Sequence, residues 1–308
     1  MRVAVLCGGV GAARLLAGMV RAVPPAGVTA VVNVGDDMEL HGLAISPDLD
    51  TVVYTVAGAI DPERGWGLRD ETWQAMATLE RYGGQTWFSL GDRDLGTHLY
   101  RTQRRAEGAP LSTVTAEIAR AWGLELAVLP VSDDPVRTMI TLAGSGEEVA
   151  FQDYFVARRH AVPVASVRVA GAESARPAPG VLEAIAGADR VVVAPSNPIV
   201  SIGPVLAVPG VRDAVAARRD AVVAISPLVG GRALKGPADR LLRELGHGDS
   251  VAGVAALYAP FAGTLVVDAA DAAHADAVRA AGLRCVVTDT IMRDPGAAAA
   301  LCAVALGE

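Results

Sequence analysis

The chain has 308 residues, of which 52% are hydrophobic and 20% charged, and its formal net charge at pH 7 is −7. A chain of this length and apolar content can bury a sizeable core, which excludes a disordered protein. The acidic balance argues against a general nucleic-acid-binding protein. The three cysteines, Cys7, Cys285 and Cys302, lack CxxC spacing, so the sequence indicates neither a zinc site nor a disulfide framework.

The first apolar run is too short for the core of a signal peptide. No stretch reaches the roughly 18 apolar residues that a membrane span needs. We therefore expect a cytoplasmic protein that contacts neither membrane nor nucleic acid. Lys235 is the only lysine among the 27 basic residues, a skew that we interpret as the codon bias of a GC-rich genome.

The N-terminal residues predict a strand at 3–6, a glycine turn at 8–11, a helix at 12–22 and a buried strand at 30–34. This order is typical of a parallel βαβ unit. Further strands are predicted at 125–129, 149–155, 164–169, 190–194, 221–225, 264–267 and 284–288. Further helices are predicted at 49–56, 69–82, 111–122, 180–186, 211–218, 238–245, 250–258, 270–281 and 295–305.

This alternation predicts an α/β fold, a Rossmann-like, doubly wound and mostly parallel sheet with a smaller inserted α-rich subdomain. Residues 1–60 and 165–308 are expected to form the nucleotide-binding core. Residues 61–164 are less regular and contain every tryptophan, so we interpret them as the inserted subdomain.

Gly8, Gly9 and Gly11 follow the first strand directly. Glycines at this place let backbone amides approach a phosphate at the start of a helix, although a tight turn without a ligand is the alternative. A dinucleotide fingerprint would have a third glycine where this chain has Arg14. A Walker loop would have a lysine directly after the glycines, and Lys235 is far away in the sequence. Arg14 is itself a candidate phosphate contact.

Carboxylates are concentrated just after the second strand. Asn33, Asp36 and Asp37 lie at the strand's carboxyl end, which faces the same crevice as the glycine turn. Asp48 and Asp50 come just before the next predicted helix, where one of them could serve only as an N-cap. Adjacent carboxylates beside a phosphate site favour Mg²⁺, whereas an Asp-rich turn is the plainer interpretation.

Two more polar segments are candidates. In the segment 90–98, Arg93 is suited to clamp a phosphate and His98 to transfer a proton, with Asp92 beside them, unless the segment is only a salt-bridged turn. In the segment 194–204, Ser196, Asn197 and Pro198 follow a strand. Such a loop can recognise a nucleobase or ribose, or can be only a connection.

The segments GGVGAAR, NVGDD, SPDLDTVVY, RGWGLRDETW, LGDRDLGTH, FQDYFV and APSNPIVSIGP resemble the 2-phospho-L-lactate transferase family of coenzyme F420 biosynthesis. The resemblance spans the whole chain in the expected order and is strongest to the actinobacterial phosphoenolpyruvate transferase branch. One departure is Gly96, where the family pattern has alanine.

The resemblance implies a Mg²⁺-dependent enzyme, usually a homodimer. Its acceptor would be the deazaflavin FO, and its donor enolpyruvyl- or lactyl-diphosphoguanosine. The terminal ribityl hydroxyl would attack the phosphorus that bears the three-carbon acid and release GMP, giving dehydro-F420-0 or F420-0. Carried over by motif, Asp36 and Asp50 are the metal or FO-side candidates and Arg93 contacts the acceptor or diphosphate. The nucleotide crevice would be formed by Gly8 to Gly11 and by Ser196, Asn197 and Pro198.

Two other functions remain open from the residues. One is an NAD(P)-dependent oxidoreductase, which the incomplete glycine fingerprint disfavours. The other is a nucleotide-sugar-binding regulator of the gluconeogenesis-factor type, which resembles the same fold family. For the transferase, we predict that Trp66 or Trp73 lies near the deazaflavin ring, because flat rings gain from stacking.

Overall fold

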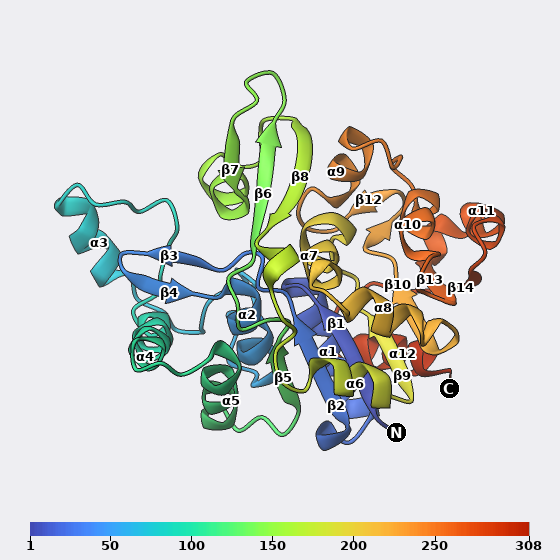
Figure 1. Ribbon diagram of the computed structural model, residues 1–308, viewed down its shortest axis with the longest axis horizontal. Helices are drawn as coiled ribbons and strands as arrows, with labels where there is room; N and C mark the ends of the chain where they lie inside the picture. Colours follow the sequence, from blue (N-terminus) through green and yellow to red (C-terminus); the bar gives the residue numbers. More distant parts are fainter. Residues whose placement is uncertain (308) are drawn as a thin grey trace.

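The computed structural model describes residues 1–307 and is built around a seven-stranded sheet (Figure 1). Every neighbouring pair of its strands is parallel. Most of the strands are short Val-rich segments, as expected where helices cover both faces of a sheet. The predicted α/β fold is therefore confirmed. In spatial order the strands are β14 (Arg284–Thr288), β13 (Thr264–Asp268), β10 (Val222–Ile225), β9 (Arg190–Val193), β1 (Val3–Cys7), β2 (Val28–Val32) and β5 (Ala127–Pro130).

The direction of winding changes between β1 and β9. From β1 the chain passes through α1 (Val10–Ala22) to β2, whereas from β9 it passes through α7 (Gly203–Ala207) and α8 (Val211–Ala216) to β10, in the opposite direction across the sheet. Because such crossovers are right-handed, these helices cover opposite faces. A crevice forms where the winding reverses, at the carboxyl ends of β1 and β9.

The helices form two groups around this sheet. α1 packs against α2 (Pro47–Val56) and α12 (Pro295–Leu306), and α6 (Val181–Gly187) packs against α8. The C-terminal half adds α9 (Ala238–Glu244), α10 (Val251–Tyr258) and α11 (Ala275–Ala280), and the small hairpin of β11 (Leu228–Val229) and β12 (Arg232–Ala233).

The middle of the chain lies beside the sheet and contains both helices and strands (Figure 1). Its helices are α3 (Gln74–Arg81), α4 (Asp94–Ala106) and α5 (Leu111–Ala121), and its antiparallel strands are β6 (Arg137–Leu142), β7 (Glu148–Ala150) and β8 (Val164–Ala170). The hairpin of β3 (Met38–Leu40) and β4 (Leu43–Ile45) precedes them. Within the range 61–164, β5 belongs to the central sheet, so this range is not one continuous insertion.

Several predicted elements differ from the structure. The strand predicted at 149–155 ends at Ala150, and a π-helical turn, Asp153–Ala157, follows because Phe151 and Tyr154 bury their rings at helical spacing. The helix predicted at 69–82 begins only at Gln74, where Asp92 caps its first amides. The strand predicted at 30–34 lies at Val28–Val32.

Two further differences concern a helix that the sequence did not predict and a predicted helix that the structure divides. α4 begins inside the polar segment 90–98, where no helix was predicted. The helix predicted at 270–281 is divided into a 3₁₀ segment, Ala269–His274, and α11.

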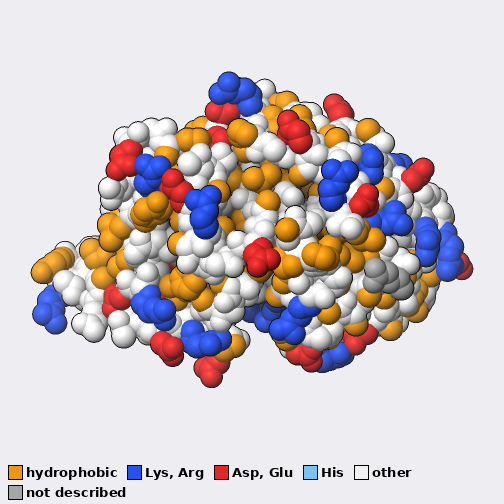
Figure 2. All heavy atoms as spheres, turned by 90° about the horizontal axis from the view of Figure 1, so that it is seen from below, with side chains coloured by type: hydrophobic (Ala, Val, Ile, Leu, Met, Phe, Trp, Pro, Cys, Tyr) orange, Lys and Arg blue, Asp and Glu red, His pale blue; other side chains and the backbone are white. Residues whose placement is uncertain are grey.

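No helix in residues 1–307 is long and apolar enough to cross a lipid bilayer. Figure 2 shows acidic and basic side chains interspersed over the face that it draws. That face therefore carries no extended basic patch of the kind that binds nucleic acid.

Candidate active site

A cavity of about 640 Å³ opens at the point where the winding of the sheet reverses. The turn after β1 and the loop after β9 contribute to its lining, together with the start of α2 and segments of the middle region. Polar and charged lining residues are Arg14, Asp36, Asp48, Thr51, Arg64, Ser89, Gln152, Ser196, Asn197, Ser201, Ser226, Lys235 and Thr290. A site here is expected, because open α/β sheets bind ligands at the carboxyl ends of their strands.

Two positions in the turn after β1 must be glycine, because neighbouring atoms leave no room for a Cβ atom. A Cβ atom on Gly9 would lie 2.6 Å from Oδ1 of Asp48, and a Cβ atom on Gly11 would collide with the carbonyl oxygen of Pro195. Gly9 also precedes the first residue of α1, whose N-terminus carries unpaired amides and a partial positive charge. The turn therefore brings an anion-binding helix end and a carboxylate into the same cavity.

Asp36 and Asp48 form a buried acidic pair on the cavity lining. Asn33 donates from Nδ2 to Oδ2 of Asp48 at 2.9 Å, and its Oδ1 accepts from the Gly35 amide at 2.8 Å. Within residues 1–307, Oδ1 of Asp36 has no hydrogen-bond partner although it is buried. Burial and the charge of Asp48 raise the pKa of Asp36, and burial raises the pKa of Asp48 to about 6. Within the described part of the chain, no basic side chain forms an ion pair with Asp36 or Asp48, and a divalent metal would supply the missing positive charge.

Asp50, which the sequence paired with Asp36, is not among the residues that line this cavity. Asp48 and Asp50 are two residues apart on α2, and at 100° per residue they point to nearly opposite sides of the helix. Asp50 instead accepts hydrogen bonds from both Nη atoms of the buried Arg101, and the bond from Nη1 to its Oδ2 is 3.1 Å long. Asp48, rather than Asp50, therefore shares the cavity lining with Asp36, and the assignment of Asp50 to a metal stays a prediction.

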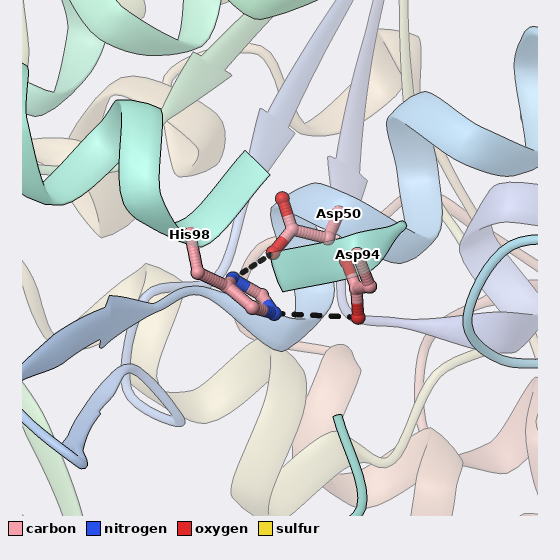
Figure 3. Close-up of side chains that lie close together, drawn as sticks. All are labelled: Asp50, Asp94 and His98. Carbon is pink, nitrogen blue, oxygen red and sulfur yellow. Dashed lines mark ion pairs between the residues drawn. The ribbon is translucent and has the colours of Figure 1, made fainter. Parts of the chain in front are cut away.

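Asp50, Asp94 and His98 meet in a second polar cluster (Figure 3). Nε2 of His98 lies 3.3 Å from Oδ2 of Asp94, and Nδ1 lies 3.8 Å from Oδ2 of Asp50. One ligand atom from each residue lies within 4.8 Å of the others, so the three could hold a metal ion. However, Arg101 already neutralises Asp50, and Tyr54 donates to Oδ1 of Asp94 at 2.6 Å. These contacts also connect α4 to α2, so the cluster combines a possible metal site with a buried Arg101–Asp50 ion pair.

The other carboxylates of the acidic motifs serve local structure. Oδ2 of Asp37 accepts from the Ser46 hydroxyl at 2.7 Å, and Asp37 lines a separate cavity of about 80 Å³. Asp92 accepts from the amides of Gln74 and Ala75, both at 3.0 Å. The Arg93 guanidinium donates to a backbone carbonyl. Neither Asp92 nor Arg93 lines the main cavity, and their assignment to a ligand stays a prediction.

The loop after β9 meets the glycine turn. Oγ of Ser196 accepts from the Gly8 amide at 3.3 Å, and Oδ1 of Asn197 accepts from the amide of Ile199 at 2.9 Å. Of the predicted site residues, those on the lining are Gly9, Gly11, Arg14, Asp36, Ser196 and Asn197. Those off the lining are Gly8, Asn33, Asp37, Asp50, Asp92, Arg93, His98 and Pro198.

Sequence reasoning missed part of the cavity wall. Trp66 lines it and is 42% exposed, whereas Trp73 does not line it and packs edge-on against Trp66 with ring centroids 5.8 Å apart. The missed lining residues include the aromatic side chains Trp87, Phe88, Phe151 and Phe155, and also Lys235. The run FQDYFV was a usable signal for two of these, whereas no local pattern pointed to Lys235.

The fold and the site define an α/β enzyme with an anion-binding helix end and an acidic pair at the switch point of a parallel sheet. The family model described as 2-phospho-L-lactate transferase CofD matches residues 3–302, and the chain belongs to this family. It is therefore a transferase of phosphoenolpyruvate or phospholactate in coenzyme F420 biosynthesis, as the sequence resemblance predicted.

Curated relatives and solved structures agree with this assignment. A phosphoenolpyruvate transferase of Streptomyces griseus is 46% identical over 99% of this chain and 98% of its own length. A phosphoenolpyruvate transferase of Mycobacterium avium is 42% identical over 99% of this chain and 98% of its own length. A crystal structure of a UPF0052-family protein from Bacillus halodurans has a TM-score of 0.64 at 18% identity, covering 99% of this chain and 98% of its own, a likeness of fold alone.

Proposed function

We propose that the chain transfers the enolpyruvyl phosphate group from enolpyruvyl-diphosphoguanosine to the terminal ribityl hydroxyl of FO, releasing GMP and forming dehydro-F420-0. The choice of the enolpyruvyl over the lactyl donor is supported by relatives 41–46% identical that are named phosphoenolpyruvate transferases. A cavity of about 640 Å³ is within the usual range for sites of small molecules and cofactors.

The observation that carries the proposal is the acidic pair beside the N-terminus of α1. Phosphoryl transfer depends mainly on positioning and on neutralisation of the phosphate oxygens. The unpartnered Oδ1 of Asp36, with Asp48 close enough to raise its pKa, fits a hard cation with oxygen ligands. Asp36 and Asp48 would hold Mg²⁺, which when bound neutralises phosphate oxygens.

The chain's own groups bind and orient the reactants. The amides at the start of α1 bind a phosphate of the donor, and Ser196 and Asn197 flank the nucleotide. The ribityl oxygen forms a bond to the phosphorus that bears the three-carbon acid. The bond from that phosphorus to the oxygen of GMP breaks, and the hydroxyl proton is released.

Aromatic side chains of the middle region support an acceptor site for a flat ring. Trp66, Trp87 and Phe88 line the same cavity as the acidic pair. Trp66 is held in place by Arg64, whose guanidinium carbon lies 5.6 Å from the centroid of its ring. We place the deazaflavin ring of FO against this wall, where offset stacking is favourable.

Steady-state assays with FO and each of the two activated donors test the proposal. We expect Mg²⁺-dependent product with the enolpyruvyl donor and a lower kcat/KM with the lactyl donor. A higher kcat/KM with the lactyl donor would reverse the donor assignment, and the absence of product from both donors would reject the proposed reaction.

A further inference from the structure

Lys235, the chain's only lysine, lies on the lining of the main cavity. It belongs to the short segment 234–237 between β12 and α9. Its Nζ atom lies 2.7 Å from the position that a Cβ atom would take on Gly65. A Cβ atom on Gly236 would lie 3.8 Å from the ring of Phe155. The segment is thus seated between two parts of the middle region, each of which contributes to the cavity wall.

Arg14, on α1, is a second cation on the same lining. Both side chains line the same cavity, and the pKa of Lys235 is lowered by burial and, further, by the charge of Arg14. No carboxylate within residues 1–307 forms an ion pair with either side chain. Two neighbouring cations repel each other, and an anion between them would turn this repulsion into attraction.

Arg64, a third cation on the lining of this cavity, differs from Arg14 and Lys235 because the chain itself pairs it with a carboxylate. Its Nη2 lies 2.8 Å from Oδ2 of Asp61 and donates to the Leu68 carbonyl at 3.1 Å. Its guanidinium also lies over Trp73, 5.1 Å from the ring centroid. Arg64 is therefore committed to the aromatic wall, whereas Arg14 and Lys235 are available to a ligand.

We infer that Lys235 and Arg14 together bind an anionic group of the activated donor, through its carboxylate or its phosphate oxygens. The inference rests on the proposed function and adds a subsite to it. The donor carries several anionic groups, whereas Asp36 and Asp48 contribute negative charge to the same cavity. Mg²⁺ held by Asp36 and Asp48 would neutralise only part of the donor's negative charge. Lys235 and Arg14 would neutralise the rest.

Calorimetric titration of GDP and of lactyl-diphosphoguanosine, both with Mg²⁺, tests this subsite. The variants are Lys235→Gln and Arg14→Gln, and the matched control is Arg21→Gln, which removes a charge from the same helix away from the cavity. We expect lactyl-diphosphoguanosine to bind at least about tenfold more weakly to both cavity variants, because each loses a charge-assisted contact. The control should bind as the unmodified protein does.

The two probes distinguish the two sources of negative charge. Weaker binding of both nucleotides assigns the pair to phosphate, and weaker binding of the lactyl compound alone assigns it to the carboxylate. Binding within twofold of the unmodified protein for both probes and both variants would overturn the inference. Lys235→Arg, a third variant, keeps the positive charge. If it loses as much affinity for the donor as Lys235→Gln does, the inference is also overturned, since packing rather than charge would then explain the loss.

Product formation from FO by the unmodified protein is measured separately. If no product forms while Lys235→Gln weakens GDP binding, the proposed reaction fails and the anion subsite stands. If product forms while both cavity variants bind both probes normally, the subsite fails and the reaction stands.

Discussion

Gly9 and Asp48 are so close that only a hydrogen atom fits between them: a Cβ atom at position 9 would lie 2.6 Å from Oδ1 of Asp48. Gly9→Ala should displace Asp48 and lower kcat/KM at least about 100-fold while the chain stays folded. Assays with thermal unfolding would show this, and full activity would contradict the close approach.

Gly96→Ala is the matched control for that substitution. Nothing lies within 4 Å of a Cβ atom there, and Gly96 is in the first turn of α4. Alanine should leave activity unchanged and stabilise the chain by about 0.5 kcal/mol, because it loses less backbone entropy on folding.

Asp36→Asn keeps the shape of the side chain and removes its charge. We expect Mg²⁺-dependent turnover to fall at least about 1000-fold, because one of two metal-holding carboxylates is lost. The melting temperature without metal should not fall, since a repulsive buried charge is removed. Glu39→Gln, an exposed change three residues away, is the control. Normal turnover in the Asp36 variant would contradict the metal assignment.

We expect Asp50→Asn to lower the stability of the chain, unlike Asp36→Asn, which should lower turnover without lowering stability. It leaves the fully buried Arg101 without its carboxylate, and breaking a buried ion pair costs about 3–5 kcal/mol. Denaturant unfolding should therefore show a large loss of stability. If stability is unchanged and only Mg²⁺ dependence is lost, Asp50 is a metal ligand, as the sequence motif first indicated.

The acidic pair predicts a pH dependence. A carboxyl group whose pKa is higher in the folded chain holds its proton more tightly there. The free energy of unfolding contributed by Asp48 therefore falls as the pH rises from about 4 through about 6. Mg²⁺ binds the ionised pair, so it should raise the melting temperature more at pH 8 than at pH 5. An equal shift at both values would contradict this. Asp48→Asn should remove most of the difference.

The sheet and the motif order were predictable because strand–turn–helix periodicity is local. β6 is absent from the predicted strands, although the alternating burial of Thr138, Ile140 and Leu142 is a local signal. α4 could not be found from apolar periodicity, because its buried side includes His98 and Arg101. Their partner Asp50 is remote in the sequence.

The site was predictable only in part for the same reason. Gly9, Gly11 and Asp36 lie in short motifs at strand ends, and the topology brings these ends together. Which of Asp48 and Asp50 lines the cavity depends on the rotation of α2 about its axis, which the sequence motif does not specify. Lys235 reaches the cavity through a tertiary contact with the loop of Gly65, and no spacing rule connects them.

The most direct test of the proposed reaction is mass spectrometry of both products from one mixture of FO, enolpyruvyl-diphosphoguanosine and Mg²⁺. We predict FO joined to enolpyruvyl phosphate together with an equal amount of GMP, and neither product when Mg²⁺ is removed by a chelator. FO joined to GMP together with free phosphoenolpyruvate would show that the other phosphorus is attacked. That result, or GMP without modified FO, would contradict the account.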